Sequence, residues 1–195
     1  SGWEMGDFLG RLLKAEGIAW RPIPMEGETR VALMVHDQST GLEYRFLPEG
    51  PEVTPAEIDA CAAAIADRKS GYVVASGSLP RGAPADSFAR LAKAAAANGL
   101  PFVLDTSGAG LKAALAQGGI FLVKPSQSEL ESYAGHPLDA PGIEATARAI
   151  IADGKAAAGL VQGDVLAGAH ALLALQLLAA RGDGTGLAVV LEHVE

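Results

Sequence analysis

The chain has a single cysteine, Cys61, and few positive charges among its 195 residues. One cysteine excludes an internal disulfide framework and a thiolate metal cluster. Lys and Arg number 15 against 23 Asp and Glu, so the formal net charge of -8 predicts no basic surface for nucleic acid. A few local cations and a helix N-terminus could still bind a phosphorylated metabolite.

Long apolar runs are missing as well. No segment reaches the roughly 18 consecutive apolar residues of a membrane span, and the N-terminus has no signal-peptide pattern. Hydrophobic residues make up 49% and charged residues 19%, which is typical of a globular protein and not of a disordered one. We expect one substantial core, a reducing cytoplasmic location and a buried, non-catalytic position for Cys61.

The first fifty residues predict a helix followed by a β-hairpin. Apolar residues recur at helical spacing over residues 6–17. Residues 30–36 and 42–47 are rich in β-formers and flank a turn-like cluster at residues 37–41. These features predict an antiparallel hairpin that lies outside the α/β alternation of the remaining chain.

The remaining chain alternates between helices and strands. Thr54 and Glu57 form a capping-box pattern that starts a helix running to about residue 68. Strands are predicted at 72–75, 101–104, 120–123 and 187–191, with a run at 156–161 that is short for a strand, and helices at 85–97, 109–117, 127–134, 143–152 and 165–180. This alternation predicts a parallel sheet covered by helices. We therefore expect an α/β core, residues 1–27 and 48–195, with a small β-flap at residues 28–47.

Three short polar segments, residues 76–80, 105–108 and 124–130, each follow an apolar strand. Ligands of an open parallel sheet bind outside the carboxyl ends of its strands. We therefore expect Ser78, Asp105 and Lys124 to lie around one anion-binding cleft. In the third segment, Pro125 suits the first turn of a helix whose N-terminal N–H groups would attract an anion.

Each candidate residue also has a structural interpretation. Glu129 could bind a Mg²⁺-bound water or complement the helix dipole. The Ser78 loop could face a sugar phosphate or be an ordinary strand-to-helix turn. Asp105 could contact ligand hydroxyls or cap the helix that follows it. Arg30 and Arg45 could be lowered onto a phosphate by the flap or remain solvated.

From residue 27 to 138 the sequence resembles the ribokinase-like family of carbohydrate kinases, in particular its minor-type 6-phosphofructokinase branch. The resemblance is carried, in the expected order and spacing, by Gly27-Glu28-Thr29-Arg30, Glu43-Tyr44-Arg45-Phe46, Ser76-Gly77-Ser78-Leu79-Pro80-Arg81-Gly82, Asp105-Thr106-Ser107-Gly108 and the segment 124–130. It implies a Rossmann-type three-layer α/β sandwich with a mostly parallel sheet and a β-flap that acts as a lid.

The resemblance also implies an activity, the ATP-dependent phosphorylation of fructose 6-phosphate to fructose 1,6-bisphosphate. The implied partners are ATP, Mg²⁺, a sugar phosphate and a second copy of the chain bound through the flap. The implied roles are substrate binding by Arg30, Ser78 and Arg45, ATP binding by Lys124, Ser126 and Gly163, organisation of Mg²⁺ through water by Glu129, and proton acceptance by Asp164.

The sequence departs from the family pattern at three places. Members normally carry Asn where Ser126 stands. The family's glycine-rich sugar-binding segment, which would precede Gly6, is not in the sequence. The catalytic Gly-Ala-Gly-Asp motif is reduced to Gly163-Asp164, too close behind Lys155 for the strands that usually intervene. Asp164 could therefore be the catalytic base or the N-cap of the next helix.

Other functions stay open at this point. The acceptor could be fructose 1-phosphate or tagatose 6-phosphate, whereas Arg30 with Ser78 argues against an unphosphorylated nucleoside. A non-catalytic, kinase-derived binding protein would fit the reduced motif. A serine hydrolase is not supported, because no Gly-x-Ser-x-Gly sequence occurs.

Overall fold

The computed structural model describes residues 3–159 and 187–190, and the following statements concern those residues. They form two compact units. The first contains residues 3–60 together with Pro80–Ala83, and the second contains Cys61–Leu79 together with residues 84–159 and 187–190. The chain crosses from the first unit to the second within the helix Pro55–Ala66, between Ala60 and Cys61. It crosses again on either side of the segment Pro80–Ala83.

The first unit contains α1 (Trp3–Ala15) and the hairpin of β1 (Leu33–His36) and β2 (Glu43–Phe46). The predicted helix is confirmed, although it begins three residues earlier than expected. The two strands pair antiparallel, with Leu33 opposite Phe46 and His36 opposite Glu43, which confirms the hairpin.

Asp37 organises the tip of this hairpin. Its Oδ1 accepts hydrogen bonds from the Ser39 backbone N–H at 2.8 Å and the Ser39 hydroxyl at 2.7 Å, and its Oδ2 accepts one from the Thr40 hydroxyl at 2.7 Å. The Ser39 and Thr40 side chains are the main reason that the pKa of Asp37 falls from 3.8 to about 2. Gly41 closes the turn with a φ of 71°, a conformation that favours glycine.

Helix α2 (Pro55–Ala66) begins with the predicted capping box. The Thr54 N–H donates to Glu57 Oε2 at 2.6 Å, and the Glu57 N–H donates to Thr54 Oγ1 at 3.3 Å. At the other end, the side-chain amide of Asn98 donates to carbonyls of Ile65 and Arg68. Those bonds give carbonyl groups at this helix end a side-chain donor, and the Ile65 carbonyl also accepts from the Arg68 N–H at 2.9 Å.

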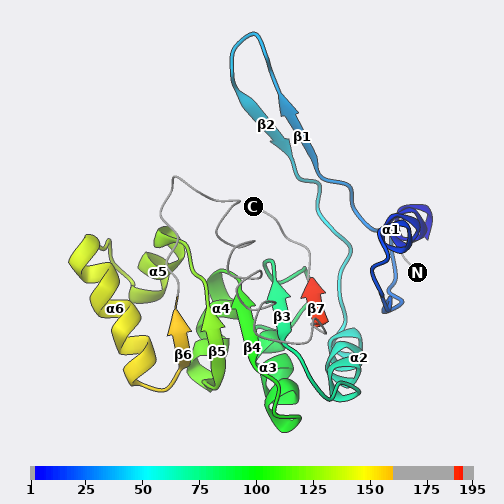
Figure 1. The fold of residues 1–195 in the computed structure, drawn as a ribbon. Coiled ribbons are helices and arrows are strands. Elements are labelled where there is room, and N and C mark those ends of the chain that lie inside the picture. Colours follow the sequence, from blue (N-terminus) through cyan, green and yellow to red (C-terminus); the bar gives the residue numbers. More distant parts are fainter. Residues whose placement is uncertain (1–2, 160–186, 191–195) are drawn as a thin grey trace. The chain divides into compact units, whose positions relative to one another are not determined.

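The second unit contains a five-stranded parallel sheet in the order β6-β5-β4-β3-β7 (Figure 1). Its elements are β3 (Val73–Ser76), α3 (Ser87–Ala97), β4 (Phe102–Asp105), α4 (Gly108–Gln117), β5 (Ile120–Val123), α5 (Gln127–Ala134), α6 (Ala140–Ala152), β6 (Ala156–Gly159) and β7 (Leu187–Val190). The predicted parallel α/β architecture is therefore confirmed. The short run at 156–161 does form a strand, because its first four residues extend the sheet beside β5.

Helix α6, like α1, begins earlier than the sequence indicated. Helix α6 was expected from residue 143 but starts at Ala140. The Asp139 carboxylate accepts a hydrogen bond from the Gly142 N–H at 2.9 Å, and Pro141 occupies the first turn. An N-cap followed by Pro is a strong helix start, so the cap overrides the weak apolar pattern of these residues.

The hydrophobic core of the second unit lies between the sheet and its helices. Its fully buried side chains include Val73, Ala75, Phe102 and Leu104 from strands and Phe88, Leu91, Leu111 and Leu115 from helices. Gly110 allows α4 to approach closely, since a Cβ there would lie 2.9 Å from the Phe88 ring. Cys61 packs against this core but is only half-buried, so the buried position expected for it was wrong.

Among the described residues, no helix has the length and apolar character that crossing a bilayer would require. The predicted helix at 165–180 lies outside the described residues.

Candidate active site

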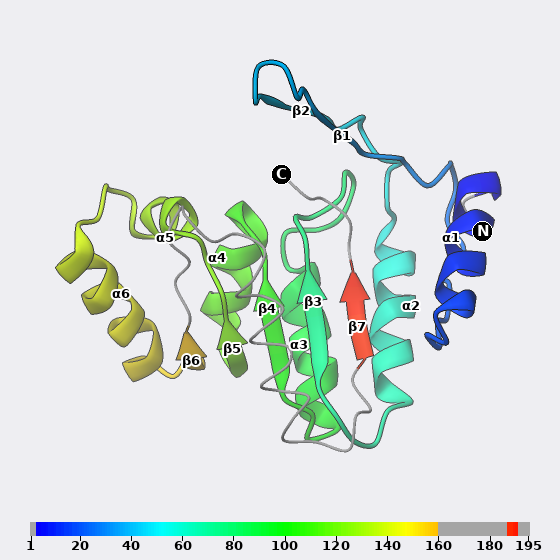
Figure 2. The ribbon, with the colours of Figure 1, turned by 45° about the horizontal axis from the view of Figure 1, so that its top comes forward.

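The carboxyl ends of β3, β4 and β5 lie side by side, as Figure 2 shows. Ser76 is opposite Asp105 across β3 and β4. The Gly77 N–H donates to the Asp105 carbonyl at 2.9 Å, and the Lys124 N–H donates to the Leu104 carbonyl at 3.0 Å. The three polar segments that the sequence singled out therefore leave one edge of the sheet together.

At this edge Lys124 and Asp105 form an ion pair. Lys124 Nζ lies 3.2 Å from Asp105 Oδ1, and the exposed fractions of the two side chains are 13% and 31%. A mostly buried ammonium requires a partner because its desolvation is costly. Asp105 supplies that partner, and it is not the cap of α4, whose N-cap is Ser107.

The loop that carries Ser78 is fixed by the loop after β4. The Ser78 and Ser107 hydroxyl oxygens lie 3.1 Å apart. The buried Thr106 hydroxyl donates to the Gly77 carbonyl at 2.8 Å. Gly77 has a φ of 107°, which a side chain would disfavour. Thr106 and Ser107 were not predicted individually as site residues, and the available signal was their position directly after β4.

Helix α5 begins beside Lys124 with a second capping box. Ser126 is the N-cap, the Ser126 N–H donates to Glu129 Oε2 at 2.7 Å, and the Glu129 N–H donates to Ser126 Oγ at 3.3 Å. Pro125 therefore precedes the cap, and its expected place in the first turn was wrong. The positive end of the helix dipole and the ammonium group thus lie next to each other along the chain, which favours an anion.

Glu129 is compatible with Mg²⁺ carried by a nucleotide. One of its oxygens is engaged in the capping box. In the described part of the chain, no group of three or more His, Cys, Asp or Glu side chains could hold a metal ion. Mg²⁺ is commonly bound through one or two carboxylates together with substrate phosphates and water. A water-mediated contact of Mg²⁺ with Glu129 fits this description.

The other predicted site residues are not among the described residues of the second unit. Arg30 and Arg45 belong to the first unit, where Arg30 Nη1 donates to the Pro48 carbonyl at 3.1 Å and Arg45 lies 3.9 Å from Glu43. Gly163 and Asp164 lie outside the described residues.

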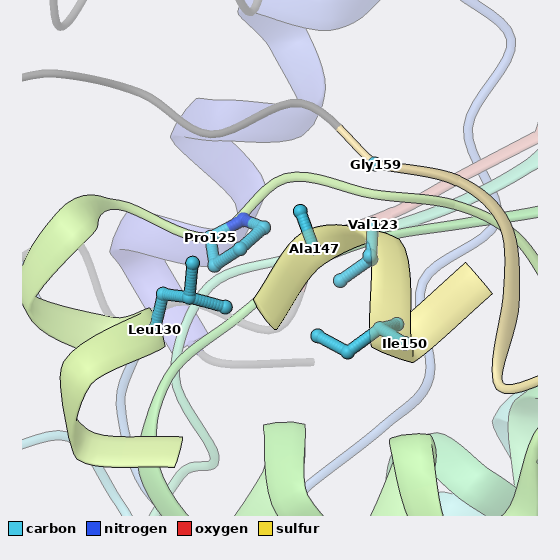
Figure 3. Close-up of a pocket in the computed structure, with 6 residues that line it drawn as sticks. All are labelled: Val123, Pro125, Leu130, Ala147, Ile150 and Gly159. Atoms are coloured by element: carbon cyan, nitrogen blue, oxygen red, sulfur yellow. The ribbon is translucent and has the colours of Figure 1, made fainter. Parts of the chain in front are cut away.

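A small recess lies next to the start of α5 (Figure 3). It is lined by Val123, Pro125, Leu130, Ala147, Ile150 and Gly159. These residues offer apolar side chains or none, so the recess supplies no group that would orient a phosphate. The polar edge formed by Ser78, Asp105 and Lys124 is the better candidate site.

Comparison with known proteins agrees with this reading of the fold. Residues 2–164 match the pfkB family carbohydrate kinase domain. The chain therefore belongs to the pfkB family of carbohydrate kinases, which confirms the resemblance seen in the sequence.

Two curated relatives illustrate the similarity. The chain is 36% identical over 200 residues to ATP-dependent 6-phosphofructokinase isozyme 2 of Mycobacterium tuberculosis, covering 97% of this chain and 58% of that protein. It is 38% identical over 149 residues to 1-phosphofructokinase of Xanthomonas campestris, covering 73% and 47%. The chain thus spans about half the length of the curated relatives it matches.

A solved structure gives the same answer for the fold. The crystal structure of phosphofructokinase-2 from Escherichia coli in complex with fructose-6-phosphate superimposes with a TM-score of 0.76 at 32% identity. The superposition covers 83% of this chain and 54% of that one. The ribokinase-like α/β fold expected from the sequence is confirmed.

Proposed function

We propose that this chain is part of a kinase that transfers the γ-phosphoryl group of ATP to a hydroxyl group of fructose 6-phosphate, giving fructose 1,6-bisphosphate. The observation that carries the proposal is the Lys124–Asp105 pair at the carboxyl edge of the sheet, in a member of the pfkB family. The named relatives are phosphofructokinases of the 6- and 1-phosphate types.

On the nucleotide side, Lys124 would approach the phosphates of ATP together with Ser126 and the backbone of Gly163. An incoming phosphate competes with Asp105 for the Lys124 ammonium, which is already held at the sheet edge. Glu129 would organise Mg²⁺ through water, and the bound ion would neutralise charge on the transferring phosphoryl group. Such catalysis depends mostly on positioning and charge neutralisation.

On the acceptor side, Arg30 and Ser78 would hold the phosphate already present on the sugar, with Arg45 contributed by the flap. Asp164 would accept the proton of the attacking hydroxyl group. Ser78 is already constrained by its contact with Ser107, which reduces the ordering that substrate binding would require. These roles follow from the family resemblance.

A second acceptor is favoured by one specific observation, the 38% identity to a 1-phosphofructokinase. Arg30 and Ser78 can hold a phosphate without specifying whether it is on C1 or C6. Fructose 6-phosphate, fructose 1-phosphate and tagatose 6-phosphate should therefore be compared directly, with ³¹P NMR assigning the phosphorylated carbon of each product.

The hairpin supports a homodimer formed through the flap. Both strands expose large apolar side chains, namely Leu33, Met34, Val35, Tyr44 and Phe46. An isolated two-stranded hairpin is marginally stable in water, so a second copy of the hairpin is the natural partner. Light scattering should show a dimer that Leu33→Lys with Phe46→Lys converts to a monomer. A cytoplasmic location completes the proposal.

The decisive experiment is a transfer assay with ATP, Mg²⁺ and fructose 6-phosphate. Asp164→Asn should lower kcat by about 10²–10⁴-fold, the usual contribution of a general base. Arg148→Gln, which removes an exposed ion pair with Glu144 on α6, should leave kcat unchanged. Calorimetric binding of both substrates without any turnover would contradict transfer and favour the kinase-derived binding protein.

A further inference from the structure

Pro80–Ala83 belongs to the first unit although the chain on both sides of it belongs to the second. We call this segment the strap, and residues 48–53 the stem. The Val53 N–H donates to the Arg81 carbonyl at 2.7 Å. Arg81 Nη1 lies 2.7 Å from Glu49, and its Nη2 lies 3.1 Å from Glu52. One arginine therefore binds the stem through its backbone and through two carboxylates.

Gly82 lets the strap lie directly on the stem. Its φ is 77°, and a Cβ at this position would lie 2.6 Å from the Val53 carbonyl oxygen and 3.3 Å from the Val53 nitrogen. A side chain would therefore force the two segments apart. The close approach at Gly82 and the ion pairs of Arg81 therefore join the same two segments, the strap and the stem.

The stem also contacts Arg30. Arg30 Nη1 donates to the Pro48 carbonyl at 3.1 Å, and a Cβ at Gly50 would meet the Arg30 side chain at 3.5 Å. On the other side, Ser78 is separated from the strap by Leu79 alone. Arg30 and the strap thus both contact the stem, and the strap is covalently continuous with the Ser78 loop.

We propose that Arg81 is a positioning residue that couples the Ser78 loop to the stem that contacts Arg30. The proposal rests on the proposed function, in which Arg30 and Ser78 hold the phosphate of the substrate. Arg81 acts through Glu49 and Glu52 and does not itself bind the substrate. Each exposed ion pair is individually weak, but two carboxylates and a backbone bond on one residue restrict its movement together.

If Arg81 instead contacted the phosphate directly, removal of the Glu49 and Glu52 carboxylates would have the opposite effect on the affinity for fructose 6-phosphate. If Arg81 positions the loop, then Glu49→Gln with Glu52→Gln should weaken fructose 6-phosphate binding as Arg81→Gln does. If Arg81 binds the phosphate itself, removing the two competing carboxylates should strengthen binding. Whether the Glu49→Gln/Glu52→Gln variant binds fructose 6-phosphate more weakly or more tightly therefore distinguishes the two roles.

The experiment combines calorimetry with amide hydrogen exchange on the full chain. Arg81→Gln and the Glu49→Gln/Glu52→Gln variant should each raise the Kd for fructose 6-phosphate about 3–10-fold, the size expected from one or two surface pairs. Combining all three substitutions should add little further loss, because the same contacts are removed. Arg148→Gln should leave the Kd unchanged. Tighter binding in the carboxylate variant, or full additivity, would overturn the proposal.

Hydrogen exchange tests the coupling without any ligand. Arg81→Gln should speed exchange of the Val53 amide, which bonds to the strap, and of the Gly77 amide, which bonds to Asp105. The Leu130 amide, bonded to Ser126 in α5, should keep its protection. Faster exchange at Val53 without any change at Gly77 would overturn the coupling. If the unaltered chain binds no sugar phosphate, the proposed function fails, whereas the coupling is still judged by these amides.

Discussion

Lys124 Nζ lies 3.2 Å from Asp105 Oδ1, and the two residues come from the tips of neighbouring parallel strands. The ion pair joins two of the three polar segments that the sequence places at strand ends. It also gives a lysine with only 13% of its side chain exposed a carboxylate partner. A phosphate entering this edge would meet a cation that is already positioned.

The first prediction concerns this pair. Asp105→Asn should lower the free energy of unfolding by about 1–3 kcal/mol, because it leaves a mostly buried ammonium without its carboxylate. Adding Lys124→Met to that variant should recover part of the loss, since the uncompensated charge is then gone. Urea unfolding of the two single variants and the double variant measures the coupling. Simply additive losses would show that the pair contributes nothing to stability.

The second prediction concerns the cap of α5. Ser126→Ala removes the hydroxyl that accepts from the Glu129 N–H and should cost about 1 kcal/mol. Ser126→Asn should keep the stability, because Asn caps helices as well as Ser does. If this position contacts the nucleotide, Ser126→Asn should also tighten MgATP binding, since the family normally carries Asn here. Weaker MgATP binding by the Asn variant in calorimetry would argue against that contact.

The third prediction concerns Asn98, whose side-chain amide donates to the carbonyls of Ile65, Ala66 and Arg68 at 3.2, 2.8 and 3.1 Å. Asn98→Ala leaves these carbonyls without this donor and should cost about 1–3 kcal/mol in urea unfolding. Lys93→Ala, at an exposed position of α3, is the matched control and should change stability little. Equal stability of both variants would show that water replaces the amide without cost.

The fourth prediction concerns pH and the hairpin tip. Because the folded pKa of Asp37 is about 2, below its ordinary 3.8, its ionised form stabilises the tip. That stabilisation should be complete above about pH 4 and lost as the pH falls through about 2. The Ser39 amide chemical shift should report this titration by NMR. A midpoint near 4, or an unchanged profile in Asp37→Asn, would contradict the bonding of the tip.

The elements that the sequence predicted best have strong local signals. Strand β5 and helix α5 have the predicted bounds, because Gly118 and Gly119 precede an apolar run and Ser126 with Glu129 marks the helix start. The start of α6 was missed because Asp139 acts as a cap ahead of the apolar pattern. Local chemistry therefore accounts for both the successes and this error.

The contacts of the candidate site depend on strand register, which the sequence does not encode locally. The pairing of Lys124 with Asp105 requires β4 and β5 to be neighbours with their tips level. The contact between Ser78 and Ser107 likewise joins two loops that are 29 residues apart. The sequence predicted that these segments share an edge, but the partner of each side chain required the three-dimensional structure.

The account is tested most directly by amide chemical-shift mapping of the ¹⁵N-labelled chain during titration with fructose 6-phosphate and then MgATP. We expect fructose 6-phosphate to shift resonances of residues 76–80 and 105–107, and MgATP to shift those of residues 124–129. Shifts confined to the far ends of the strands, or no shifts at these three segments, would contradict a phosphate-binding edge.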